Sequence, residues 1–241
     1  MTRFPLKALC KWSATFAFLA AVVAVPANVR AQDNIKLTKH NFSSISGRSS
    51  VAGAADISAG VADYGEICVY CHTPHGGQTG APLWNRSFGA TPYQMYTVAN
   101  SATLDMVVAA TPGSVSLACL SCHDGTIGID VITNPPNSSA ATSLGLTMGG
   151  LFPTGLNSLK NLSTDLRNDH PIGVTFATSG VNSDASFNAL ATIKLAGLKF
   201  YGTGVDQVEC ATCHNPHSST NVPFLRIANA GSALCLTCHI K

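Results

Sequence analysis

The sequence predicts a mostly irregular fold in which short α-helices, with little β structure, wrap around large bound apolar groups. Eight of the nine cysteines fall into four Cys-x-x-Cys pairs, a pattern typical of attachment or metal-binding sites. Apolar residues make up 46% of the chain but aromatic residues only 7%, so few large side chains are at hand to fill a core. Regular elements are therefore expected to be short and to lead into the cysteine pairs.

Residues 1–31 have the pattern of a secretory signal peptide. Basic residues precede an apolar run over 12–25, and a stretch of small residues leads to Ala31. Cleavage is expected after Ala31, with Ala27 as the alternative. The apolar run is shorter than the roughly 20 residues that a membrane-spanning helix needs, so no span is expected. We expect an exported protein that is extracellular or at the cell surface, with the periplasm as the alternative.

Removal of the signal peptide changes the charge of the chain. Four of the 14 basic residues and none of the 12 acidic residues lie in residues 1–31, which leaves a balance of −2. No basic patch indicates nucleic-acid binding. The ninth cysteine, Cys10, leaves with the signal peptide, and every remaining cysteine belongs to a pair.

Each of the four cysteine pairs is followed at once by a histidine, which is the signature of covalent c-type haem attachment. Two intervening residues allow both thiols to form thioethers with the vinyl groups of one porphyrin, and the next imidazole can then ligate the iron. Zinc ribbons need two pairs to converge on one ion and have no use for a fixed histidine in every pair. We therefore expect four covalent haem c groups. Their attachment cysteines and iron-ligating histidines are Cys68, Cys71 and His72; Cys119, Cys122 and His123; Cys210, Cys213 and His214; and Cys235, Cys238 and His239.

The four remaining histidines match the four distal iron positions, which predicts bis-histidine coordination at every iron. These histidines are His40, His75, His170 and His217. A methionine ligand would raise the reduction potential, but the methionines of the mature chain have no motif context. Met95, Met106 and Met148 are expected to fill the core instead.

Two of these histidines follow a haem-binding histidine by only three residues. His75 lies in Cys-His-Thr-Pro-His and His217 lies in Cys-His-Asn-Pro-His. Three extended residues reach about 10 to 11 Å, whereas passing from one face of a haem to the other requires roughly 12 Å between alpha carbons. Neither histidine can therefore ligate the haem of its own motif, and each is expected to serve a neighbouring haem.

The chain is internally duplicated. Each half has one upstream histidine, then a Cys-x-x-Cys-His-x-Pro-His motif, then a second Cys-x-x-Cys-His motif. The predicted division is a first dihaem module over 32–132, a linker or crossover loop over 133–165 and a second dihaem module over 166–241. The longest predicted helix runs from about residue 184 to residue 199, with Ser183 as its N-cap.

The doubled motif, the Pro-Leu-Trp-Asn-Arg run at 82–86 and the Lys-His-Asn-Phe-Ser run at 39–43 resemble the multihaem cytochromes of metal-reducing bacteria. Among these, the chain most resembles the tetrahaem OmcE-type cytochromes, which polymerise into extracellular filaments. The resemblance implies bis-histidine irons, one distal ligand donated by the adjacent subunit, and a continuous chain of haems for extracellular electron transfer.

Three functions follow from these observations. The first is the subunit of a head-to-tail filament in which His40 ligates a haem of the neighbouring subunit and electrons pass to redox partner proteins or extracellular acceptors. The second is a monomeric periplasmic or surface electron carrier, in which His40 stays on the haem of Cys68 and Cys71. The third is a multihaem reductase, which would need an iron with an open position. The histidine count disfavours such an enzyme, so an electron carrier with no catalytic residue is expected.

Two arginines occupy matching places in the two halves. Arg86 and Arg226 follow the two Cys-x-x-Cys-His-x-Pro-His motifs. Because a guanidinium binds a carboxylate in bidentate fashion, they are candidates to pair with haem propionates. A solvated surface position is the equal alternative.

Overall fold

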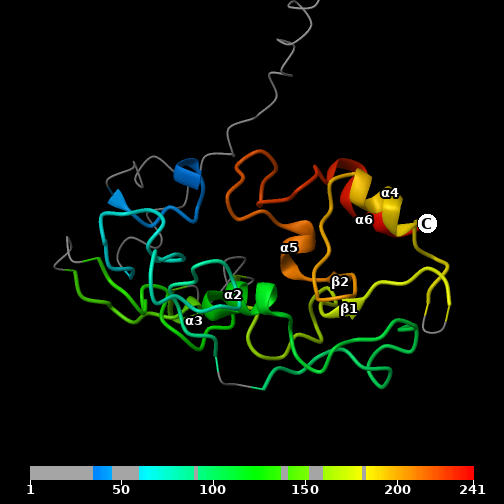
Figure 1. Ribbon diagram of the computed structural model, residues 1–241, viewed down its shortest axis with the longest axis horizontal. Coiled ribbons are helices and arrows are strands. Elements are labelled where there is room, and N and C mark those ends of the chain that lie inside the picture. The colour runs from blue at the N-terminus through cyan, green and yellow to red at the C-terminus, as the bar shows by residue number, and fades with distance from the viewer. Residues whose placement is uncertain (1–34, 45–59, 90–91, 137–140, 152–159, 181–182) are drawn as a thin grey trace, which may run out of the picture. The chain divides into compact units, whose positions relative to one another are not determined.

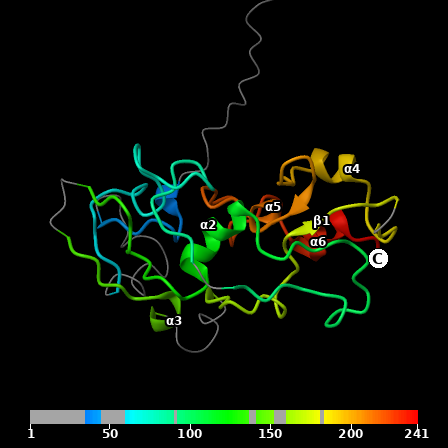
Figure 2. The same ribbon diagram turned by 60° about the horizontal axis from the view of Figure 1, so that its bottom comes forward.

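Short helices separated by long irregular stretches make up the part of the chain that the structure, a computed structural model, describes (Figures 1 and 2). The described residues are 35–44, 60–89, 92–136, 141–151, 160–180 and 183–241, so the signal peptide lies outside them. The helices are η1 (Ile35–Leu37), α2 (Ser114–His123), α3 (Met148–Leu151), α4 (Leu190–Leu195), α5 (Cys210–Cys213), η5 (Ala230–Ser232) and α6 (Ala233–Cys238). The predicted fold class is confirmed.

The β structure consists of one short antiparallel pair in the described residues. Strands β1 (Val174–Thr175) and β2 (Gln207–Val208) pair in the register Val174 with Val208 and Thr175 with Gln207. Only one residue, Glu209, separates β2 from α5, so the strand pair fixes where the third cysteine pair begins. Helices α2 and α5 contact each other, and both views show them side by side (Figures 1 and 2).

The described residues form three small apolar clusters instead of a single large core. One surrounds Tyr70 and Ile129, a second surrounds Ile193 and Phe176, and a third surrounds Leu120. Met148, Met106 and Met95 are buried in the first, second and third cluster respectively, which confirms them as core residues. Cysteines of the motifs pack against the first two clusters, so the attachment sites lie at the edges of the apolar core.

The predicted helix over 184–199 is wrong in its length and its cap. The observed helix α4 spans only Leu190–Leu195, and Ser183 instead donates a hydrogen bond to the Gly180 carbonyl at 2.7 Å. The residues before α4 are held by tertiary hydrogen bonds, because the Asn188 backbone N–H donates to the Cys238 carbonyl at 2.7 Å. At the other end, Gly197 has φ +107°, a conformation that no helix accommodates.

Backbone contacts group residues 33–241 into one compact unit. The division of the mature chain into two modules and a linker stays a prediction. Within the described residues, no helix is both long enough and apolar enough to cross a bilayer.

Candidate haem-attachment sites

The four Cys-x-x-Cys-His motifs share one local conformation, a single helical turn that ends at the histidine. We number them sites 1 to 4 after His72, His123, His214 and His239. In sites 1, 3 and 4 the histidine backbone N–H donates to the carbonyl of the first cysteine, at 2.8, 3.1 and 2.9 Å. At site 2 the motif forms the end of α2. One helical turn puts residues three apart on the same face, so both thiols of each pair can reach one porphyrin edge. All eight thiols are free.

The motif histidines are oriented by backbone carbonyls. The Nδ1 atoms of His72, His123 and His214 lie 2.8, 2.8 and 3.1 Å from the carbonyl oxygens of Pro82, Lys160 and Pro223. A carbonyl only accepts hydrogen bonds, so each Nδ1 must carry the proton and donate it. The lone pair then lies on Nε2, which is the arrangement that metal-ligating histidines use.

Two of the carbonyls belong to matching loops. After site 1 the chain returns so that Thr73 N–H donates to Leu83 and Asn85 N–H to Cys71, both at 2.8 Å. After site 3, Asn215 N–H donates to Phe224 at 2.7 Å and Arg226 N–H to Cys213 at 2.8 Å. Leu83 and Phe224 both have positive φ, at 52° and 62°. The loops after sites 1 and 3 therefore share one pattern of backbone hydrogen bonds. In that pattern Arg226 takes the place of Asn85, so the prediction that Arg86 and Arg226 occupy matching places is wrong.

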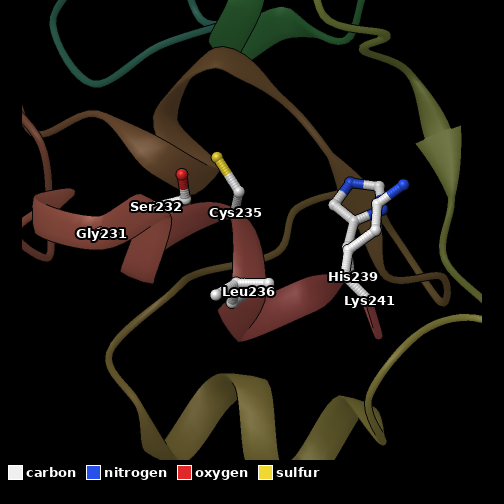
Figure 3. A pocket seen from close by; sticks show the side chains of 6 residues that line it. All are labelled: Gly231, Ser232, Cys235, Leu236, His239 and Lys241. Carbon is white, nitrogen blue, oxygen red and sulfur yellow. The ribbon is translucent and has the colours of Figure 1, made fainter.

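Site 4 opens onto a hollow of about 530 Å³ lined by η5 and α6. Figure 3 shows the sulfur of Cys235 and the ring of His239 projecting to the same side of the α6 ribbon. Thiol and imidazole thus face a common space, as attachment of one haem requires.

A buried donor beside site 1 also fits a haem. The indole ring of Trp84 meets the His72 ring edge-on with 5.7 Å between ring centres. Its Nε1–H is buried and has no hydrogen-bond partner among the described residues. A buried donor without a partner is costly, and a haem propionate is an acceptor that would satisfy it.

Three of the remaining histidines lie opposite motif histidines. The ring centres are 6.1 Å apart for His217 and His72, 6.2 Å for His40 and His123, and 6.4 Å for His170 and His239. An imidazole nitrogen lies about 2 Å from a ligated metal, so two imidazoles on opposite sides of one iron have ring centres about 6 Å apart. His75 is exposed and makes no such contact within the described residues.

Burial favours the neutral form of five of the imidazoles. Together with the nearby His123, it lowers the pKa of His40 to about 4. Burial is also the main cause that lowers the pKa of His123, His214, His217 and His239. A neutral imidazole retains the nitrogen lone pair that iron needs, so the sites favour ligation at neutral pH.

The surface interpretation of Arg86 is wrong. Its side chain is fully buried and donates to the carbonyls of Ser121, Gly128 and Ile129, at 2.7, 2.7 and 2.5 Å. These bonds join the loop after site 1 to α2 and to the turn that follows it. Arg226 is partly buried and donates to the Ala211 carbonyl at 2.7 Å, next to site 3.

Sequence reasoning missed Glu209. This buried carboxylate accepts hydrogen bonds from the Gly113 N–H, at 3.2 Å, and from the Ser116 hydroxyl, both at the start of α2. Its own backbone N–H donates to Thr212 Oγ1 at 2.9 Å in a capping box on α5. Glu209 therefore joins the helices of sites 2 and 3. The glutamate just before the third cysteine pair, with threonine three residues later, was the available signal.

Comparison with protein families supports the haem assignment. Residues 203–241, which contain sites 3 and 4, match the family described as the doubled CXXCH motif. No curated protein matches the chain significantly. The doubled motif indicates covalently bound haem c and supports a multihaem c-type cytochrome, which fits an electron carrier.

Proposed function

We propose that the chain is an electron-transfer protein that carries four haem c groups, each with two axial histidines. The observation that carries the proposal is the repeated local geometry: four helical turns with paired free thiols, three of them with a histidine whose Nδ1 is bound to a carbonyl. The haem iron supplies the redox change when bound. The protein orients the ligands, keeps them neutral and closes both axial positions, which favours electron transfer over substrate binding.

Contacts between cysteines support a connected set of haems, because sites 1 and 2, sites 2 and 3, and sites 3 and 4 each have neighbouring thiols. Burial and the neighbouring Cys122 of site 2 together raise the pKa of Cys71 at site 1 to about 12. Cys119 at site 2 and Cys210 at site 3 are neighbours as well, because each shifts the pKa of the other. Cys213 at site 3 and Cys238 at site 4 are also electrostatic neighbours. Haems attached at such neighbouring sites would lie close enough for electrons to pass between them.

The filament role is part of this proposal, with the monomeric carrier as its alternative. We place the protein outside the cell or on its surface, as the signal-peptide pattern and the resemblance of residues 39–43 and 82–86 suggest. The sequence pointed to His40 as the ligand donated to a neighbour. However, the His40 ring lies against His123 and stacks on Phe224 at 4.3 Å in its own chain. This supports a haem of the same chain, at site 2 rather than site 1.

His75 is the better candidate for the donated ligand. It is exposed and lines an open pocket of about 410 Å³ on the loop over 74–83. His75 cannot ligate the haem of site 1, because the three-residue spacer after His72 is too short to reach the other face of that haem. A ligand donated from each copy to the next is a head-to-tail contact, which produces an open polymer when the rotation does not close a ring.

Spectroscopy and imaging test the two parts of the proposal separately. The purified protein should hold four haems per chain, give low-spin spectra in both oxidation states and bind no carbon monoxide. Carbon monoxide binding at one haem per chain would favour the reductase instead. Negative-stain images of the secreted fraction should show filaments that His75→Ala abolishes and His40→Ala retains. The reverse result would restore His40 as the link, and absence of filaments from the unmodified protein would leave the monomeric carrier.

A further inference from the structure

The contacts between histidine rings assign distal ligands to individual haems. We propose that His217, His40 and His170 are the distal ligands at sites 1, 2 and 4 respectively, which leaves site 3 as the haem that His75 serves. This assignment rests on the proposed bis-histidine cytochrome. It goes beyond that proposal because it says which of the many possible pairings the chain uses.

The three contacts share a pattern that iron coordination would impose. Each joins one motif histidine to one histidine outside the Cys-x-x-Cys-His motifs, and no histidine takes part twice. The separations of 6.1, 6.2 and 6.4 Å agree with each other and with the spacing of about 6 Å expected across an iron. All eight histidines are among the described residues, so His75 and His214 remain as the fourth pair.

The assignment of His217 ties the two halves of the chain together. His217 follows His214 by three residues, which excludes its own haem at site 3. Its ring lies against His72, so the haem bound covalently by the first half would take its second ligand from the second half. Because His214 ligates the haem of site 3 and His217 that of site 1, the three-residue spacer between them forces these two haems to be neighbours.

The angles between ring planes make the assignment visible by spectroscopy. The rings of His72 and His217 are nearly parallel, at 22°, whereas the other two pairs are inclined at 62° and 75°. Parallel imidazoles both donate to the same iron dπ orbital and so separate its energy from that of the other dπ orbital. Crossed imidazoles donate one to each orbital and leave the two nearly equal in energy. Site 1 should therefore give a rhombic low-spin electron paramagnetic resonance signal, and sites 2 and 4 strongly anisotropic signals.

Single substitutions in the haem-loaded protein test this. His217→Ala should remove the rhombic signal, create one high-spin iron per chain and leave the strongly anisotropic signals in place. His170→Ala is the matched control: it should remove one anisotropic signal and leave the rhombic signal unchanged. Mass spectrometry should confirm four haems in both variants. Loss of an anisotropic signal in His217→Ala, or of the rhombic signal in His170→Ala, would overturn the assignment.

A measurement on the unmodified protein covers the case in which a variant does not fold. Proton contacts with Trp84 identify the haem of site 1, because the ring centres of Trp84 and His72 are 5.7 Å apart. Contacts with Phe187 identify the haem of site 4, because its ring centre is 4.5 Å from that of His239. Paramagnetic nuclear magnetic resonance should then show nearly parallel axial rings on the Trp84 haem and crossed rings on the Phe187 haem. The opposite order would overturn the assignment. Four low-spin haems with the wrong pairing would refute only the assignment, whereas fewer haems or an open iron would refute the proposed function.

Discussion

The loop after site 1 and the loop after site 3 have the same backbone hydrogen bonds but different supports. In both, a proline carbonyl fixes the motif histidine, and a residue with positive φ follows that proline. The first loop is anchored by Arg86, which is fully buried and reaches carbonyls about 35 to 43 residues along the chain. Arg226 is partly buried and donates to the Ala211 carbonyl and the Tyr201 hydroxyl, which lie 15 and 25 residues away in the sequence. The duplicated part is thus the histidine-orienting loop, while its attachment to the rest of the protein differs between the halves.

The largest difference between the loops should appear when each arginine is replaced by methionine. Arg86→Met leaves several buried carbonyls without donors and should lower the free energy of unfolding by about 3 to 5 kcal/mol. Arg226→Met removes two partly exposed bonds and should cost about 1 to 2 kcal/mol. Denaturant unfolding of the two haem-loaded variants measures both. Equal losses would mean that the two loops are supported alike.

A smaller effect is expected from the length of the loops. The first loop is one residue longer than the second, because Pro82 lies ten residues after His72 whereas Pro223 lies nine residues after His214. A Cβ at Gly77 would lie 2.8 Å from the backbone carbon of Leu83 and 3.0 Å from the Trp84 oxygen. Gly77→Ala should therefore push the two sides of the loop apart and cost about 1 to 3 kcal/mol. Thermal unfolding followed at the haem absorbance should show this loss, while Ser219→Ala in the second loop stays close to the unmodified protein. An unchanged Gly77→Ala variant would show that the first loop can widen freely.

The smallest effect concerns Glu209, the buried glutamate before site 3, whose counterpart Glu66 before site 1 is exposed. Burial raises the pKa of Glu209 above its ordinary value of 4.5, against the lowering effects of the Ser116 and Gly113 hydrogen bonds. The folded state therefore binds the proton of the Glu209 carboxyl group more tightly than the unfolded state does. Protonation of Glu209 stabilises the fold below pH 4.5, and this stabilisation is lost as pH rises through the raised pKa. Glu209→Gln removes this titration and should flatten the pH dependence of the free energy of unfolding over that range. An equally steep pH dependence in Glu209→Gln and in the unmodified protein would contradict this account.

The sequence predicted what depends on short spacing and left open what depends on distant contacts. The four Cys-x-x-Cys-His motifs, the irregular fold and the buried methionines could all be recognised from local patterns. The burial of Arg86 could not, because its acceptors lie in a turn far along the chain. The helix before site 4 was overestimated because Asn188 bonds to α6 instead of continuing a helix. The contact of His40 with His123 could not be predicted either, because nothing in the sequence around His40 indicates that these two rings lie together.

Intact mass spectrometry of the mature, exported protein tests the central claim most directly. Four covalent haems use all eight free thiols, so the mass should exceed that of the polypeptide from residue 32 by about four times 0.6 kDa. Treatment with acid and an organic solvent should not remove this excess, because thioether bonds are covalent. An excess of three haems or fewer, or haem that is lost on denaturation, would contradict the account.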